Sequence, residues 1–93
     1  MHVLVQTLEL QLPGCQSLKE KRRRVGRLRD RFGKYSQIAV CESDHADRHG
    51  QSQWSFVFAG TSRPQLESVA SEVELFAATE LDAVLLSCDQ EWL

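Results

Sequence analysis

The chain has 93 residues, of which 42% are hydrophobic and 26% charged, and its formal net charge is −2. This length suits one domain with a single core, and no apolar run is long enough to cross a bilayer. No secretory signal is seen, and the three widely spaced cysteines, Cys15, Cys41 and Cys88, form no metal or redox pair. These features predict a cytoplasmic protein with reduced thiols.

Charge is distributed unevenly along the sequence. Residues 19–34 contain nine of the eleven basic residues and only two acids, Glu20 and Asp30, which gives a formal charge of +7. The rest of the chain contains two basic residues and eleven acids, which gives −9. This asymmetry bears on the choice of partner more than the net charge does, because a concentrated local field attracts ligands of the opposite sign.

The first predicted element is a strand over residues 2–12, where two kinds of side chain alternate. One face is expected to contact the helices, and it consists of Leu4, Leu8, Leu10 and Leu12. The other face begins apolar with Val3 and Val5 and becomes polar. Such a face is expected to be partly open or to contact another subunit.

A helix is predicted to follow between Ser17 and Gly33. Ser17 and Glu20 can form a capping box at its start, and Gly33 suits its C-terminal end. A helical wheel predicts a buried stripe that consists of Leu18, Val25, Leu28 and Phe32. The same wheel places an exposed arginine-rich side opposite, with Arg23, Arg24, Arg27 and Arg31.

The remaining predicted elements are strands over residues 36–43 and 52–61, a helix over 63–79 and a strand over 82–88. Cys41 and Cys88 are expected to be small core residues, and residues 89–93 a tail from which Trp92 packs onto the sheet. The order strand–helix–strand–strand–helix–strand predicts an α+β protein with the ferredoxin-like βαββαβ fold. Both helices should lie on one face of a four-stranded antiparallel sheet.

Three motifs carry a family resemblance: Pro13-Gly14, Ser17-Leu18-Lys19-Glu20-Lys21-Arg22-Arg23 and Glu42-x-Asp44-x-x-Asp47. With them the chain resembles DUF503, also called YlxP-like, a family of small bacterial proteins of unknown function. The resemblance spans nearly the whole chain and implies a ferredoxin-like fold. Genes of this family often lie among those for translation initiation and ribosome maturation factors, so it also implies a ribosome-linked role by association. It transfers no catalytic residues.

The basic helix is the first candidate site. Arginine forks match the geometry of phosphate, and neutralising several phosphates releases counterions. The residues predicted to bind nucleic acid are Lys19, Arg22, Arg23, Arg24, Arg27 and Arg31. The alternative is a solvated basic face whose charge is partly offset by pairs along the helix and by the acidic second helix.

The turn before this helix is the second candidate, with Gly14, Cys15 and Ser17 as predicted anion-binding residues. Backbone amides at a helix start can hold an anion. The turn resembles the anion cradle of acylphosphatases, which share this fold and loop. Those enzymes need a loop arginine and an asparagine that orients water, and this sequence contains no asparagine. Acylphosphatase activity is therefore excluded, whereas a simple phosphate site stays open.

Two further patterns are interpreted as structural. The turn of Glu42, Asp44, His45, Asp47 and His49 has metal-ligating residue types but no established metal-binding spacing, so a polar hairpin turn is favoured over a metal site. The alternating aromatic residues are Trp54, Phe56 and Phe58. They are expected in the core or in a buried dimer contact rather than on a base-stacking platform.

Together these patterns predict a non-enzymatic domain, without a cofactor or a membrane segment, that binds a ribosome or structured RNA through its first helix. Two alternatives stay open: a self-associating structural module that binds an acidic protein, and an anion-binding enzyme of unknown reaction. A homodimer is expected, because apolar residues occur on both faces of the first and third predicted strands.

Overall fold

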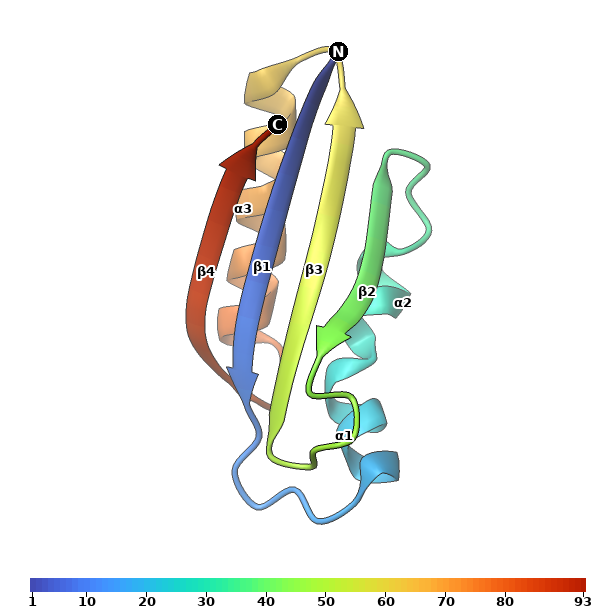
Figure 1. Cartoon of the computed structure of the whole chain (residues 1–93), viewed down its shortest axis with the longest axis vertical. Coiled ribbons are helices and arrows are strands. Elements are labelled where there is room, and N and C mark those ends of the chain that lie inside the picture. Colours follow the sequence, from blue (N-terminus) through green and yellow to red (C-terminus); the bar gives the residue numbers. More distant parts are fainter.

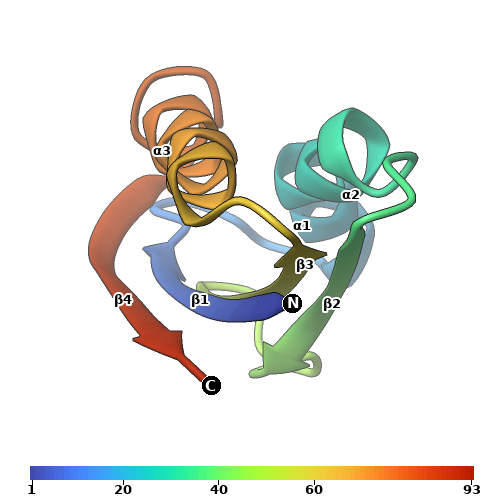
Figure 2. The same cartoon turned by 90° about the horizontal axis from the view of Figure 1, so that it is seen from above.

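All 93 residues are described by a computed structural model. In chain order its elements are β1 (His2–Gln11), α1 (Leu18–Val25), α2 (Arg27–Phe32), β2 (Ile38–Asp44), β3 (Gln51–Gly60), α3 (Arg63–Thr79) and β4 (Val84–Trp92). The sheet is antiparallel throughout, in the order β2-β3-β1-β4 (Figure 1). All three helices lie on one face, and the opposite face, here called the open face, is uncovered (Figure 2). The predicted ferredoxin-like βαββαβ arrangement is confirmed.

The central strand β1 pairs with both β3 and β4, and its three leucines, together with Leu12 just after it, are at most 1% exposed, as predicted. One polar side chain, Gln6, shares this buried face. Its Nε2 donates to the Ala70 carbonyl of α3 at 2.9 Å and to the Cys88 thiol at 3.4 Å, while its Oε1 has no partner. Burial raises the pKa of the Cys88 thiol, and the hydrogen bond from Gln6 partly opposes that shift.

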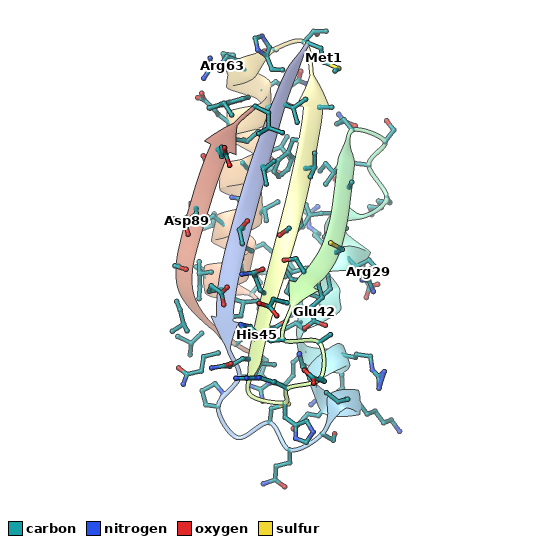
Figure 3. The ribbon with its side chains drawn as sticks, in the orientation of Figure 1. Met1, Arg29, Glu42, His45, Arg63 and Asp89 are labelled. Carbon is teal, nitrogen blue, oxygen red and sulfur yellow. The ribbon has the colours of Figure 1, made fainter.

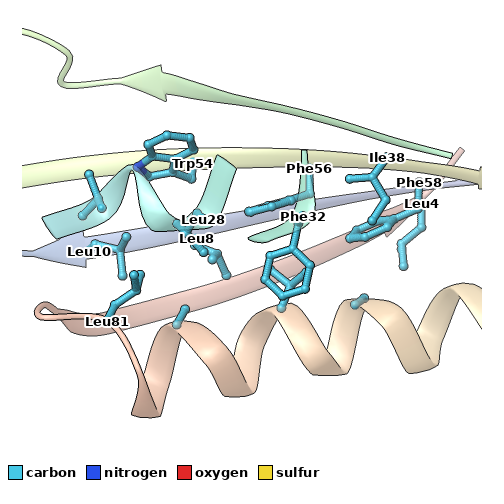
Figure 4. Packing of buried hydrophobic residues seen from close by; sticks show 14 of the residues in the cluster. Leu4, Leu8, Leu10, Leu28, Phe32, Ile38, Trp54, Phe56, Phe58 and Leu81 are labelled. Carbon is cyan, nitrogen blue, oxygen red and sulfur yellow. The ribbon is translucent and has the colours of Figure 1, made fainter. Parts of the chain in front are cut away.

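The hydrophobic core fills the space between the sheet and the helices (Figure 4). Trp54, Phe56 and Phe58 of β3 are all buried in it, which confirms their predicted core position. Phe32 of α2 meets two aromatic rings edge-on, with centroid distances of 6.2 Å to Phe56 and 5.5 Å to Phe76. These contacts tie α2 to both the sheet and α3.

The first helix differs from the prediction, because it is divided at Gly26 into α1 and α2. The Gly26 amide still donates to the Arg22 carbonyl at 2.8 Å. A methyl group at position 26 would lie only 2.4 Å from that carbonyl oxygen, so the tight local path of the chain requires glycine. The helix predicted between Ser17 and Gly33 is therefore present as two consecutive helices rather than one.

Two further expectations are corrected by the sheet. Residues 89–92 are not a tail but continue β4, where Trp92 pairs with Leu4, and the Arg63 guanidinium lies 4.3 Å above the Trp92 ring. Cys41 is exposed rather than buried, because it pairs with Ser55 and faces the open side of the sheet. Cys88 is half-buried against the core, close to its predicted position.

Candidate nucleic-acid interface

The turn that leads into α1 is organised by a capping box. The Ser17 hydroxyl accepts from the Glu20 amide at 3.0 Å, and the Glu20 carboxylate accepts from the Gln16 amide at 2.8 Å. That backbone hydrogen bond is the main reason why the pKa of Glu20 lies below its usual value, with smaller contributions from the Cys15 side chain, Arg24 and Arg23.

The predicted anion-binding residues lie in this same turn. Gly14 adopts a positive φ of 73°, which a residue with a side chain would rarely adopt. The Cys15 amide donates to the Leu12 carbonyl at 3.3 Å, and the Ser17 hydroxyl accepts from Glu20. The Glu20 carboxylate already accepts from the Gln16 amide in this turn. An anion bound here would therefore compete with that carboxylate for the amide. Anion binding by Gly14, Cys15 and Ser17 stays a prediction.

Most of the predicted nucleic-acid-binding side chains are exposed on α1 and α2. Sequence reasoning omitted two exposed neighbours, Arg29 and Lys34. We call the full set the basic face: Lys19, Arg22, Arg23, Arg27, Arg29, Arg31 and Lys34. The only ion pair in this set joins Arg23 to Glu20, at 3.9 Å. The basic face thus carries a high and largely uncompensated positive charge.

Arg24 is the exception, and its predicted exposure is wrong, since it is only 7% exposed. Its guanidinium donates to the Pro13 carbonyl at 3.1 Å and to the Asp82 carbonyl at 2.7 Å, and it lies 3.2 Å from the Asp82 carboxylate. Arg24 therefore connects the turn after β1 to the turn before β4. A side chain used in this way cannot also contact a phosphate.

Two members of the basic face, Arg27 and Arg31, also pack against aromatic rings. Arg27 donates to the Glu80 carbonyl at 2.5 Å, and its guanidinium lies 5.3 Å from the Phe76 ring centre. Arg31 lies 5.1 Å from the Phe32 ring centre and donates weakly to the Tyr35 hydroxyl at 3.4 Å. Both arginines remain exposed, so a ligand could reach them while their stems stay packed.

Lys21 was not predicted to matter, yet it is one of the largest fully buried side chains. Its ammonium group lies 2.8 Å from the Glu42 carboxylate and donates to the carbonyls of His45 at 2.5 Å and Arg48 at 2.7 Å. Ser52 donates to the same Glu42 oxygen at 2.5 Å. Helical spacing could have revealed it, because Lys21 lies one turn before Val25 on the buried stripe.

The turn that contains Glu42, Asp44, His45, Asp47 and His49 surrounds the buried ammonium group of Lys21. The Glu42 carboxylate forms an ion pair with Lys21. The Asp44 carboxylate accepts from the His45 amide at 2.7 Å, and His45 has a positive φ of 62°. Asp47 and His49 are exposed. No three His, Cys, Asp or Glu side chains converge in a way that could hold a metal ion.

A groove of about 400 Å³ lies between the α1–α2 pair and the C-terminal end of β2, and we call it the helix groove. Figure 3 shows Arg29 and Glu42 on this side of the molecule. Polar and aromatic side chains dominate its lining: Lys21, Arg22, Arg29, Asp30, Glu42 and Trp54. The groove therefore joins the basic face to the buried pair of Lys21 and Glu42.

Comparisons with known proteins address the fold and the family. No curated protein matches the sequence. A solved structure described as "Crystal structure of Putative Chlorite dismutase TA0507" is similar in fold, with a TM-score of 0.58 and 11% identity. That likeness covers 97% of this chain and 41% of the other, and at such low identity it concerns the fold alone.

No helix is both long and apolar enough to span a membrane. Residues 3–90 match the family described as "Protein of unknown function (DUF503)", so the chain belongs to the DUF503 family.

Proposed function

We propose that the protein binds structured RNA, as in ribosomal particles, through the basic face. The observation that supports this proposal is the uncompensated charge: six exposed basic side chains on two consecutive helices, and Lys34 just after them, share a single ion pair. Phosphate contacts by such side chains release condensed counterions and favour binding without any base-specific contact. The acidic remainder of the chain would orient the protein, because its negative charges are repelled by the same phosphates.

The proposal is tested with a quadruple variant, Arg22→Gln, Arg23→Gln, Arg29→Gln and Arg31→Gln, which spares the buried Arg24. We expect its affinity for ribosomal RNA fragments in about 0.1 M salt to fall by about 10²–10³-fold. The slope of log affinity against log salt should flatten by up to about 3, since each lost phosphate contact removes about 0.7–0.9. Fluorescence anisotropy across a salt series measures both quantities.

The matched control neutralises exposed acids on α3 with Glu67→Gln, Glu72→Gln and Glu74→Gln. This variant should bind RNA at least as tightly as the wild type, because it removes only negative charge. Circular dichroism confirms that each variant is folded. If the quadruple variant binds with the affinity and the salt slope of the wild type, the basic face is only solvated and the proposal fails.

A second candidate function, self-association through the open face, is favoured by apolar side chains that no element covers. Val5 of β1 pairs with Val57 of β3, and Val57 is 38% exposed. Val84 and Leu86 of β4 are exposed as well. Water would be excluded from these side chains if the open faces of two copies met, and two-fold pairing is the commonest closed arrangement.

We therefore expect a dimer at micromolar concentration in sedimentation velocity, and we expect Val57→Glu to make the protein monomeric. In such a dimer the two introduced carboxylates would lie close to the two-fold axis. They would repel each other and would lose their hydration on association. Leu75→Glu, on the exposed side of α3, is the control and should remain dimeric. A wild type that sediments only as a monomer contradicts this candidate.

A further inference from the structure

The helix groove differs from the rest of the basic face, because a buried indole side chain forms part of its wall. Trp54 is 3% exposed and lines the groove, and its Nε1 group is buried without a partner. The indole nitrogen itself has almost no accessible surface, so a ligand in the groove would meet the indole ring and the side chains beside it. Figure 4 shows the Trp54 ring among the core side chains beside Leu28 of α2.

Two arginines line the same groove without an acceptor from the protein. Neither Arg22 nor Arg29 forms an ion pair or a side-chain hydrogen bond. The Arg29 guanidinium lies 5.2 Å from the Trp54 ring centre, so the ring restrains its position before any ligand arrives. A restrained guanidinium loses less conformational entropy on binding than one that is free in solvent.

The acids of the groove do not cancel this set of donors. Glu42 is already neutralised by Lys21 at 2.8 Å and accepts from Ser52 as well. Asp30 is then the single acid left to oppose Arg22 and Arg29. The groove retains a net positive charge together with an excess of donors, and both properties suit an oxyanion rather than a cation or a neutral polar group.

We infer that the helix groove binds one phosphate group, which is held by the guanidinium groups of Arg22 and Arg29 while the Trp54 ring keeps Arg29 in position. The inference rests on the proposed RNA-binding function and deepens it. One phosphate of the RNA occupies the groove, while the other basic side chains act on flanking phosphates through solvent. Outside the groove, exposed charges more than about 8–10 Å from a phosphate are largely screened at physiological salt.

The test compares two double variants that remove the same charge. Arg22→Gln with Arg29→Gln empties the groove of its arginines, and Arg23→Gln with Arg31→Gln changes the basic face outside it. The groove variant should lower RNA affinity by about 30–50-fold in about 0.1 M salt, because both guanidinium contacts to the one bound phosphate are lost. The control variant should lower it by less than about fivefold, because its charges act through screened solvent.

A second measurement follows the Trp54 indole N–H directly by ¹⁵N NMR. Addition of a short RNA hairpin should shift the Trp54 indole resonance and leave that of Trp92 in place, with Trp92→Phe used to assign the two signals. Inorganic phosphate at millimolar concentration should shift the same resonance, which shows whether a free anion is also accepted. A Trp54 resonance that stays in place at saturating RNA overturns the inference.

The outcomes separate this inference from the function on which it rests. Equal losses of affinity in both double variants would leave RNA binding intact as a proposal and remove the groove as its phosphate site. Unchanged affinity in both double variants would remove the RNA-binding function as well. A loss confined to the groove variant, with a shifted Trp54 resonance, supports both.

Discussion

Lys21→Met should lower the free energy of unfolding by about 3–5 kcal/mol, the cost of breaking a buried ion pair from one side. Lys21 is 1% exposed and satisfies three acceptors: the Glu42 carboxylate and the carbonyls of His45 and Arg48. Methionine keeps most of the side-chain volume and removes every donor. Urea denaturation followed by circular dichroism measures the change.

The control for this prediction is Lys19→Met, an exposed lysine of the same helix, which should change stability by less than about 0.5 kcal/mol. A double variant, Lys21→Met with Glu42→Gln, should recover part of the loss, because no unpaired charge is then left behind. Similar effects of Lys21→Met and Lys19→Met would show that the buried pair does not stabilise the fold.

Phe32→Ala should also destabilise the protein by about 3–5 kcal/mol, as expected for removing a fully buried aromatic ring. Phe32 is 0% exposed and contacts Phe56 of β3 and Phe76 of α3 edge-on, so its loss leaves a cavity where α2, the sheet and α3 meet. Thermal and urea unfolding measure the effect. Tyr35→Ala, at an exposed position three residues further on, serves as the control. A loss below about 1 kcal/mol would mean that the site collapses around the missing ring.

The parts of the fold that follow from short-range periodicity were predictable. Alternation in β1 identified the buried leucines, and the helix predicted over residues 63–79 has the bounds of α3, where the Ser62 hydroxyl accepts from the Gln65 amide at 3.4 Å. These features depend only on neighbours within one turn or two strand positions.

The roles of the buried polar groups were not predictable, because their partners are distant in sequence. Arg24 is held by carbonyls 11 and 58 residues away, and Lys21 by carbonyls 24 and 27 residues away. The helical wheel places Arg24 on the exposed side, and although it places Lys21 beside Val25 on the buried stripe, it cannot supply the distant carbonyls that hold either side chain. The Trp54 indole could be assigned to the core from its alternation, but its missing acceptor could be identified only in three dimensions.

The central position of β1 has a consequence for how the chain folds during synthesis. β1 leaves the ribosome before both of its partners, because their pairing residues begin only at Gln51 in β3 and Val84 in β4. Until β3 and β4 have both emerged, β1 lacks its paired strands. In contrast, β2 and β3 can pair as a local hairpin as soon as residue 60 has emerged. Long-range pairing of this kind slows folding and prolongs the exposure of apolar surface. We expect this domain of the nascent chain to become protease-resistant only when β4, the last of the four strands, has emerged and can complete the sheet.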